Sequence, residues 1–360
     1  YYTQVIVVDK SNQRSEPSPE ISVVAGDAQR SSALVVAASD ASPASKAGAD
    51  YVCDGIADQE IINTAISSLA AGGGSVVLIN GTFKINGAIR VPSNVFLSGQ
   101  GDSTIIEVDD NVSMDFNAID LDGASHAGVK DLYLKGNKAN NTSGYHVGVR
   151  FANDSECSLS GVKIENFRNE GLSLGSSNQC NIQTARIFNN GGSGIQIIGN
   201  VNTISSCTVK YNGVGVVLIG AEENMISANT ISENTGKGLQ TVSSSRNTIN
   251  GNTFSQNNQG GISIQTSSNG NLVTNNQCIG NGDTSIYIAS DENSIQGNTC
   301  RQTGASSTSY GIRVYSGNRN LISSNDCYTA GLTAGISNSG TNTTIGTNRN
   351  NNGTWSTTPN

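Results

Sequence analysis

The feature that most constrains the fold is a repeat that runs through the second half of the chain. Each unit starts with Gly or Ser followed by an apolar residue, and consecutive starts lie 21 to 26 residues apart. The starts are Gly194, Gly215, Gly238, Gly261, Ser285, Gly311 and Gly335, with Gly148 and Gly171 in register before them. A period of this length indicates stacked supersecondary units, each of which buries its apolar side against its neighbours.

Each unit contains three short stretches in which one apolar residue stands between polar ones. In the unit that starts at Gly238 these apolar residues are Leu239, Ile249 and Phe254. A period of two is typical of a half-buried β-strand, and no unit has an apolar stripe of helix length. Three strands per turn predict an all-β parallel β-helix of roughly ten to twelve coils over about residues 75–345. The residues predicted to point inward are Ile195, Ile226, Ile249, Ile264, Ile286 and Ile312.

An Asn recurs at a fixed phase of the repeat, eight to ten residues after the first strand begins. The column is Asn181, Asn202, Asn224, Asn247, Asn271, Asn293 and Asn320. Asn is also common in turns and in low-complexity segments. Because its phase against the apolar positions is constant, we predict a ladder of side-chain amides that stack from coil to coil.

Composition excludes several classes of protein. The 360 residues carry a net charge of −8, which argues against nucleic acid as the main partner. No run of 18 apolar residues exists, so no membrane insertion is expected. Only 5% of residues are aromatic and 42 are Gly, which suits thin coils with tight corners. The chain begins at Tyr1 without Met, so we expect a fragment or a processed form.

The seven cysteines do not form a disulfide framework in a chain of this length. Cys278, Cys300 and Cys327 share one phase of the repeat, and we expect them to stack inward as buried free thiols. No Cys-x-x-Cys or His-rich pattern is present, and no metal site or cofactor is expected.

The N-terminal residues 1–48 are predicted to be a β-hairpin tether followed by a linker rich in Ala and Ser. Two alternating stretches flank the polar segment Lys10–Pro19, and Ile21–Val24 lies in the second of them. This arrangement resembles the last two strands of a fibronectin type III domain, where a Tyr-rich strand leads through a Ser-x-Pro-Ser turn. A lone hairpin is marginal in water, so this segment needs a partner surface.

Residues 49–75 are predicted to form a capping segment with one substantial helix, Asp58–Leu69. Asp58 is a suitable N-cap, and Ile62, Ala65 and Ile66 fall on one helical face. Three glycines, Gly72–Gly74, end the helix. Strands are expected next at Val76–Ile79, Thr82–Ile85 and Val95–Leu97.

The capping segment and the repeat together resemble the pectate-lyase-like right-handed parallel β-helix superfamily, most closely its phage tailspike and secreted polysaccharide-processing branch. The residues that carry the resemblance are Asp54-Gly55, Asp58, Gly72–Ser75, Gly81–Ile85, Pro92–Asn94 and Gly99–Gly101. It covers about residues 50–345 and implies a right-handed solenoid, here 76–345, whose first coil is covered by the helix. Residues 346–360 are then a C-terminal tail. The resemblance also implies a carbohydrate partner, an extracellular, cell-surface or virion location, and the homotrimeric state that is common among tailspikes.

Candidate site residues lie in the first half of the predicted solenoid. The residue that follows the inward Ile or Val of each first strand should point outward, and these residues form one column. The column is Asp120, Arg150, Ser173, Gln196, Val217, Gln240, Ser263, Tyr287, Arg313 and Ser337. It carries no charge from Ser173 to Ser263, and 21 of the 28 carboxylates lie at or before Glu170.

The densest constellation combines this column with the loops beside it. Asp120 and Arg150 are expected on adjacent coils, about 4.8 Å apart. An insertion over Lys135–Tyr145 lengthens one coil, as expected of a groove wall. The other members are Asp122, His126, Tyr145, His146, Arg168 and Glu170.

Two chemistries fit these residues. A lyase or epimerase needs a base, a cation and a proton donor, which His146, Arg150 and Tyr145 offer. A hydrolase needs two carboxyl groups across the bond, which Asp120 offers with Glu170 or Asp122. Asp122, His126, Tyr145 and Arg168 are then binding residues. The alternative is that Asp120 and Arg150 form a surface ion pair and both histidines are solvated.

The superfamily includes lyases, hydrolases, C5-epimerases and inert fibres, so the fold alone does not identify a reaction. We expect a β-helix protein that binds polysaccharide, and that as an enzyme would be a polysaccharide lyase or glycoside hydrolase. The alternative is a non-catalytic tail-fibre, adhesion or structural module. Under the first hypothesis, Asp120→Ala and His146→Ala abolish activity or weaken binding at little cost in folding.

Overall fold

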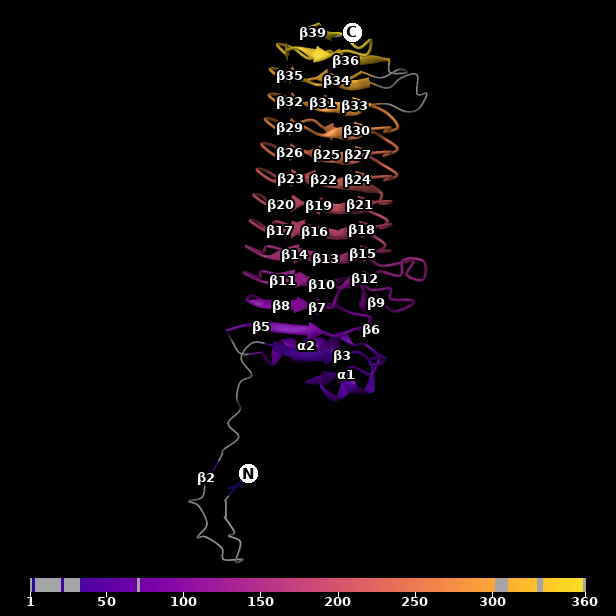
Figure 1. The fold of residues 1–360 in the computed structure, drawn as a ribbon, viewed down its shortest axis with the longest axis vertical. Coiled ribbons are helices and arrows are strands. Elements are labelled where there is room, and N and C mark those ends of the chain that lie inside the picture. The colour runs from indigo at the N-terminus through magenta and orange to yellow at the C-terminus, as the bar shows by residue number, and fades with distance from the viewer. Residues whose placement is uncertain are drawn as a thin grey trace, which may run out of the picture.

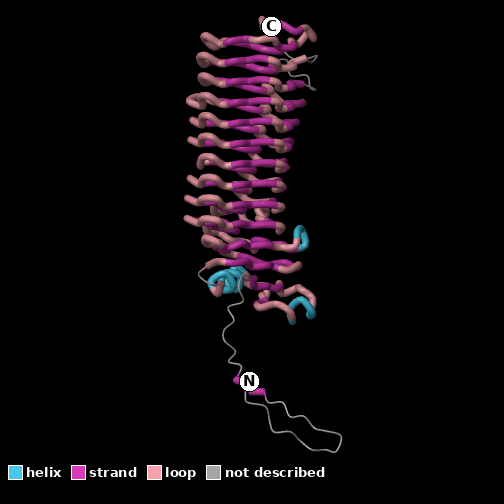
Figure 2. The backbone as a smooth tube through the Cα atoms, turned by 60° about the vertical axis from the view of Figure 1, so that its left-hand side comes forward, coloured by secondary structure: helices cyan, strands magenta, loops and turns pink. Residues whose placement is uncertain are grey.

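Stacked parallel strands form a single column over most of the chain (Figure 1). The computed structural model describes residues 2–3, 21–22, 33–69, 72–301, 310–328 and 333–358. The strands lie in three sheets of 11, 14 and 10 strands, and neighbours within each sheet come from successive coils. Figure 2 shows the strand segments aligned up the column, with helix only toward its N-terminal end. The prediction of an all-β parallel solenoid with very few helices is confirmed.

The 11-stranded sheet carries the outward column described above. Its strands are β7 (Ile89–Arg90), β10 (Phe116–Asp122), β13 (His146–Ala152), β16 (Leu172–Gly175), β19 (Ser193–Ile197), β22 (Val214–Ile219), β25 (Leu239–Val242), β28 (Ile262–Ile264), β31 (Ile286–Ala289), β34 (Tyr310–Ser316) and β36 (Ala334–Asn338).

The 14-stranded sheet extends furthest toward the N-terminus. Its strands are β4 (Tyr51–Val52), β3 (Ala33–Ala37), β5 (Gly74–Leu78), β8 (Val95–Ser98), β11 (Gly128–Lys130), β14 (Ser158–Ser160), β17 (Asn181–Gln183), β20 (Thr203–Ser205), β23 (Met225–Ser227), β26 (Thr248–Asn250), β29 (Leu272–Thr274), β32 (Ser294–Gln296), β35 (Leu321–Ser323) and β37 (Thr344–Ile345).

The 10-stranded sheet completes the column. Its strands are β6 (Gly81–Ile85), β9 (Thr104–Val108), β12 (Tyr133–Lys135), β15 (Lys163–Glu165), β18 (Arg186–Phe188), β21 (Thr208–Lys210), β24 (Thr230–Ser232), β27 (Thr253–Ser255), β30 (Gln277–Ile279) and β33 (Thr299–Arg301). Two antiparallel pairs lie outside the three sheets: β1 (Tyr2–Thr3) with β2 (Ile21–Ser22), and β38 (Asn348–Arg349) with β39 (Trp355–Ser356). The rest of the predicted N-terminal hairpin lies outside the described residues.

The core is a stack of apolar side chains, one from each short strand. In β20, Ile204 is buried between two half-exposed neighbours, Thr203 and Ser205. The six isoleucines predicted to point inward are all fully buried. Burying one such side chain contributes about 1.5–3 kcal/mol, so the continuous stack is the main source of stability.

The corners between strands combine a left-handed residue with a buried Asn. In one coil, Glu223, Ala228 and Glu233 have φ of 59°, 55° and 57°. Each is followed directly by an Asn: Asn224, Asn229 and Asn234. A residue with positive φ turns the chain sharply, and the amide after it satisfies backbone groups that the turn leaves without strand partners.

These amides form ladders along the column. The Asn224 Oδ1 atom accepts from the Asn202 backbone N at 2.8 Å and from Asn202 Nδ2 at 3.1 Å. Its own Nδ2 donates to Asn247 Oδ1 and to the carbonyl of Gly199, both at 3.0 Å. Every rung therefore satisfies buried polar groups on two neighbouring coils. The predicted ladder exists for Asn202, Asn224, Asn247, Asn271, Asn293 and Asn320.

One predicted rung is wrong, and two whole ladders were not predicted. Asn181 is exposed, and Cys180 stands at the ladder position instead, donating its backbone N to Asn202 Oδ1 at 2.9 Å. The second ladder is Asn229, Asn252, Asn276, Asn298, Asn325 and Asn348. The third is Asn190, Asn212, Asn234, Asn257 and Asn281. The five-residue spacing of Asn within a coil is the sequence signal for them.

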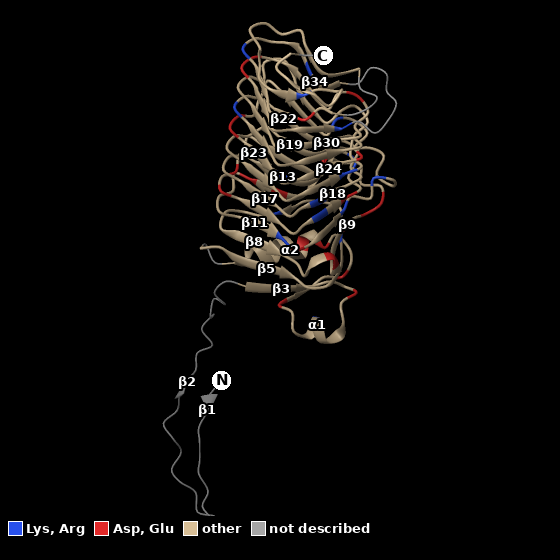
Figure 3. Ribbon diagram, turned by 45° about the horizontal axis from the view of Figure 1, so that its top comes forward, with Lys and Arg blue, Asp and Glu red and all other residues tan. Residues whose placement is uncertain are grey.

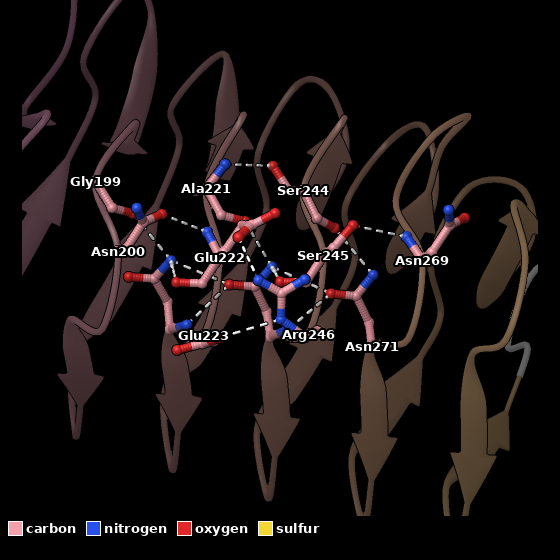
Figure 4. Close-up of polar contacts among 12 residues, drawn as sticks. Gly199, Asn200, Ala221, Glu222, Glu223, Ser244, Ser245, Arg246, Asn269 and Asn271 are labelled. Carbon is pink, nitrogen blue, oxygen red and sulfur yellow. Dashed lines mark hydrogen bonds and ion pairs between the residues drawn. The ribbon is translucent and has the colours of Figure 1, made fainter.

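Charged residues alternate along one edge of the column (Figure 3). At the corner drawn in Figure 4, Arg246 forms ion pairs with Glu222 and, at 3.1 Å, with Glu223 of the preceding coil. Because these side chains are about half exposed, each pair contributes little to stability. The buried amides beside them carry the structural role.

All seven cysteines are buried free thiols, as expected. Cys278 and Cys300 are register partners on β30 and β33, and Cys327 is also fully buried. They fill the core as small side chains.

The N-terminal end contains helix α2 (Gln59–Ser67), the five-residue α1 (Pro43–Ala47) and a short 3-10 turn, η1 (Gly101–Ser103). Helix α2 buries Ile62, Ala65 and Ile66, and it contacts strands β3 to β7. Asp58 stands at the N-cap position, but its side chain does not cap the helix. It accepts instead from the backbone N of Gly55 at 2.9 Å and of Lys84 at 2.7 Å, which ties the helix to β6.

Candidate functional site

The predicted outward column is one continuous row on the 11-stranded sheet. Strand pairing aligns Arg90, Asp120, Arg150 and Ser173 from coil to coil. It continues through Gln196, Val217, Gln240, Ser263, Tyr287, Arg313 and Ser337. This row of mainly polar side chains is what the sheet presents to solvent, although Ser263 is itself buried.

Asp120 and Arg150 interact across neighbouring strands. The Arg150 Nε atom lies 3.7 Å from Asp120 Oδ1, which also accepts from Asn117 Nδ2 at 3.2 Å. Burial raises the pKa of the Asp120 carboxyl, and the Arg150 charge only partly opposes that rise. The structure therefore contains the Asp120–Arg150 ion pair of the alternative interpretation, but the Asp120 carboxyl is partly removed from solvent.

Tyr145 and Glu170 form a second pair, between the loop before β13 and the loop before β16. The Tyr145 hydroxyl donates to the Glu170 carboxylate. Glu170 is buried, and burial together with this hydrogen bond raises the pKa of Tyr145 above its usual range. Tyr145 is therefore a neutral donor whose hydrogen is already committed to Glu170.

His146 is fully buried, so the alternative in which both histidines are solvated is wrong for this residue. Its Nε2 atom lies 3.0 Å from the Met114 carbonyl, and its ring centroid lies 5.0 Å from that of Phe116. Burial lowers its pKa. Nδ1 has no hydrogen-bond partner. A neutral imidazole that is sealed from solvent supports packing, and the expected low folding cost of His146→Ala does not fit this burial.

The remaining predicted residues, Asp122, His126 and Arg168, are exposed. His126 is exposed at a corner with φ of 56°, and its Nε2 lies 3.0 Å from Glu156 Oε2. Asp122 is exposed at the end of β10. Arg168 is exposed and donates to the Thr142 carbonyl. The fold thus brings Asp120, Tyr145, Arg150 and Glu170 to one region and leaves His126 at another edge.

A pocket of about 290 Å³ lies over this region, here called the first pocket. It is lined by Asp115, Phe116, Asn117, Tyr145, Val147, Arg150, Ser173 and Gln196. Of the predicted insertion only Tyr145 lines the pocket, and Asp115, Phe116 and Asn117 of the preceding coil line it beside Tyr145. The Tyr145 backbone N donates to Asp115 Oδ1 at 2.6 Å, and the Val112 backbone N donates to Asn141 Oδ1 at 2.7 Å.

A second pocket, of about 260 Å³, opens further along the same sheet and was not predicted. Its lining includes Lys237, Gly260, Ser263, Asp283, Thr284 and Tyr287. The outward column contains only Ser263 and Tyr287 of these, because the others come from loops that precede the strands. The sequence signal for this pocket is a charged residue in the loops just before the strands, such as Lys237 before β25 and Asp283 before β31.

Neither pocket has the character of a metal site. In the part of the chain that the structure describes, His, Cys, Asp and Glu side chains form no group of three or more that would hold a metal ion. Among the same residues, no helix has the length and apolar character needed to cross a membrane.

A family model and solved structures both support the fold. The family described as right-handed β-helix region matches residues 147–300. No curated protein sequence matches the chain.

Three solved structures illustrate the likeness of fold. The A-module of Azotobacter vinelandii mannuronan C-5 epimerase AlgE4 is 18% identical, with a TM-score of 0.67 over 81% of this chain and 96% of that one. The Dettilon tailspike protein is 16% identical, with a TM-score of 0.67 over 86% of this chain and 65% of that one. The DFA-IIIase of Arthrobacter chlorophenolicus A6, without its lid, is 14% identical, with a TM-score of 0.62 over 86% and 94%. The chain therefore has the right-handed parallel β-helix fold of these structures.

Proposed function

We propose that this chain binds a polysaccharide along the outer face of the 11-stranded sheet. The observation that carries the proposal is that two of the pockets lie on one row of mainly polar side chains. Six strand steps separate Arg150 in the first pocket from Tyr287 in the second. At ~4.8 Å per step this is about 29 Å, the scale of an extended oligosaccharide rather than of one small molecule.

The chemistry of the row suits sugar hydroxyls. Ser173 Oγ and Gln196 Oε1 lie 3.1 Å apart on neighbouring coils, and Gln240 continues the row toward the second pocket. Hydroxyl and amide groups both donate and accept hydrogen bonds, as sugar hydroxyls do. The structural relatives support a glycan ligand, since their names include a mannuronan epimerase and a tailspike protein.

Cleavage is the second candidate, and one observation favours it. Burial raises the pKa of Asp120, which is what a proton donor near neutral pH requires. Against it, Glu170 already accepts from Tyr145 and His146 is sealed in the protein. A hydrolase would then use Asp120 with Glu170, and a lyase would use Arg150 with Tyr145. Binding is the function that the contacts support best.

The test is affinity electrophoresis of the full chain against a panel of neutral and acidic polysaccharides, with a parallel assay for reducing ends and unsaturated products. We expect retarded migration in at least one polysaccharide. Arg150→Ala should reduce the retardation, whereas Arg319→Ala, at an exposed corner before β35 of the 14-stranded sheet, should not. Retardation by none of the panel would contradict the proposal. Product release that Asp120→Asn abolishes would establish the enzymatic alternative.

The remaining organisation is part of the same proposal. Each coil contributes three strands, residues 49–75 cap the column through α2, residues 1–48 tether it and residues 346–360 form a tail. The tether would resemble a fibronectin type III remnant. A tailspike and a phage protein among the structural relatives support a virion or extracellular location. The homotrimer belongs to the same proposal and rests on the sequence resemblance alone.

A further inference from the structure

We propose that the second pocket is a separate subsite for a sugar residue that bears an anionic group, a carboxylate or a sulfate. The inference rests on the proposed function, because it assigns a ligand to one part of the same sheet face. It adds a site to which neither the predicted residues nor the structural relatives point. Its parts are a cation, Lys237, an aromatic surface, Tyr287, and a glycine, Gly260, all of which line the pocket.

A glycine, Gly260, lines the pocket on the middle one of three successive coils. Leu239, Ile262 and Ile286 are register partners, and Lys237, Gly260 and Thr284 each stand two residues before them. Gly260 has φ of 126°, and a Cβ there would lie 2.8 Å from the Thr284 carbonyl oxygen. Only a glycine allows this close approach of the two coils, and Gly260 lines the pocket together with Lys237, Asp283 and Thr284 without adding a side chain to it.

Lys237 is the cation of the pocket. It is half-buried, and burial lowers the pKa of its ammonium group, whereas the Asp283 carboxylate opposes that change through space. Asp283 Oδ1 in turn accepts from the Thr284 hydroxyl at 3.4 Å. A partly desolvated ammonium group gains from an anion placed beside it, since the charged form is then stabilised again.

Tyr287 supplies the apolar surface. It lines the pocket, and its ring stacks on Tyr315 of the next coil with centroids 5.8 Å apart and planes 29° apart. The Arg313 guanidinium lies 5.2 Å from the Tyr315 ring centroid and 4.9 Å from that of Tyr310. These contacts restrain the tyrosines before any ligand arrives, so little side-chain entropy is lost on binding.

The two pockets differ in what their cations contact. Arg150 in the first pocket is paired with Asp120 on the neighbouring strand. In the second pocket, Lys237 shares the lining with Asp283, Ser263 and Gln265. The second pocket therefore offers an ammonium group beside an aromatic ring and neutral hydrogen-bonding groups, with one carboxylate, Asp283, in the same lining. The C–H face of a pyranose packs on such a ring while its charged substituent reaches the ammonium group.

The experiment is isothermal titration of the full chain with three polymers: dextran as the neutral probe, polygalacturonate as the carboxylate probe and chondroitin sulfate as the sulfate probe. Lys237→Gln should weaken binding of an anionic polymer at least about fivefold and leave dextran unaffected. Tyr287→Ala should weaken binding of the same anionic polymer by a similar factor. Tyr287→Leu keeps the side chain apolar if the alanine variant proves unstable. Lys130→Gln, at an exposed position of β11 on the 14-stranded sheet, is the matched control and should change nothing.

The outcomes separate the two proposals. If Arg150→Ala weakens binding but Lys237→Gln and Tyr287→Leu bind like the wild type, the subsite is wrong and the glycan-binding function stands. If the wild type binds dextran but neither anionic polymer, the anionic ligand is wrong. If it binds none of the three and none of the wider panel, the proposed function fails and the subsite fails with it.

Discussion

The early and the later coils of the column are held together at their corners by different chemistry. Before β11, β14 and β17 the corner residues are Ala127, Cys157 and Cys180, which are small and buried. From Asn202 onward the same position is an amide that bonds the next coil. In the early coils a carboxylate, Asp154, accepts from the backbone N of Ala124 at 2.6 Å and of Ala152 at 2.9 Å.

This difference shows how a repeated fold accommodates an individual site. A ladder requires the same residue at the same place in every coil, which leaves little room for insertions. The early coils use contacts that occur once, such as the Tyr145–Glu170 pair and the bond from Val112 to Asn141. Those coils therefore carry the long loop and most of the charge. The later coils keep their Asn ladders, and the second pocket arises mainly from the loops that precede their strands.

The largest expected effect is at the N-terminal end of the early coils. Ile62→Asp places a carboxylate at a fully buried position of α2, and burial of an unpaired charge costs several kcal/mol. We expect loss of the cooperative thermal transition, or a fall in its midpoint of about 4 °C or more, roughly what 3 kcal/mol gives in a column of this size. Ile56→Asp, at a largely exposed position, is the control. An unchanged midpoint for Ile62→Asp would show that α2 does not cap the column.

A rung of a ladder should matter almost as much. Asn252→Ala removes the acceptor of two Asn229 donors, both at 2.9 Å, and the donor to the Ile226 carbonyl. Each orphaned buried group costs about 1–3 kcal/mol, so a total of about 3–5 kcal/mol is expected in urea unfolding. Asn181→Ala, outside the ladder in an early coil, should cost less than about 0.5 kcal/mol. Equal effects of the two changes would remove the contrast between the coils.

Asp154 should make the early coils sensitive to pH. Burial raises the pKa of its carboxyl from 3.8 to about 6, so the protonated form is favoured in the folded state. The stability from this group is complete below pH 3.8 and is lost as the pH rises through about 6, by up to about 3 kcal/mol. Unfolding measured from pH 4 to pH 8 should show this loss in the wild type and not in Asp154→Asn. Asp122→Asn, a nearby exposed change, should retain the wild-type slope.

The smallest effect is expected for the pair beside the first pocket. Tyr145→Phe removes the hydroxyl that donates to Glu170 and leaves a buried carboxylate with one donor fewer. We expect a loss of about 1–2 kcal/mol and a small fall in polysaccharide affinity. Tyr211→Phe, at an exposed corner, is the matched control. A large fall in affinity with unchanged stability would instead place the Tyr145 hydroxyl in direct contact with the glycan.

Much of the early-coil site could not be predicted because strand periodicity describes strands and not the loops before them. Alternation places His146 on the same side as Arg150, but it is buried, and Val147 lines the first pocket although Val149 lies in the core. The alternation is broken between Val147 and Val149, where the corner ends and the regular strand begins. The Asp120–Arg150 contact was predictable because both residues lie within the regular part of paired strands.

By itself the sequence determined the parallel stack, the inward isoleucines, the outward row and an Asn ladder, because each depends on a short period that recurs in every coil. Only the tertiary structure decided that Cys180 rather than Asn181 begins that ladder, that three ladders exist, and that Lys237 and Asp283 share a pocket. Lys237 and Asp283 stand in different coils, and the coil between them approaches the next one closely at Gly260, where a side chain would meet the Thr284 carbonyl. Spacing along the chain fixes which way a strand residue points, whereas contacts between loops depend on how those loops turn.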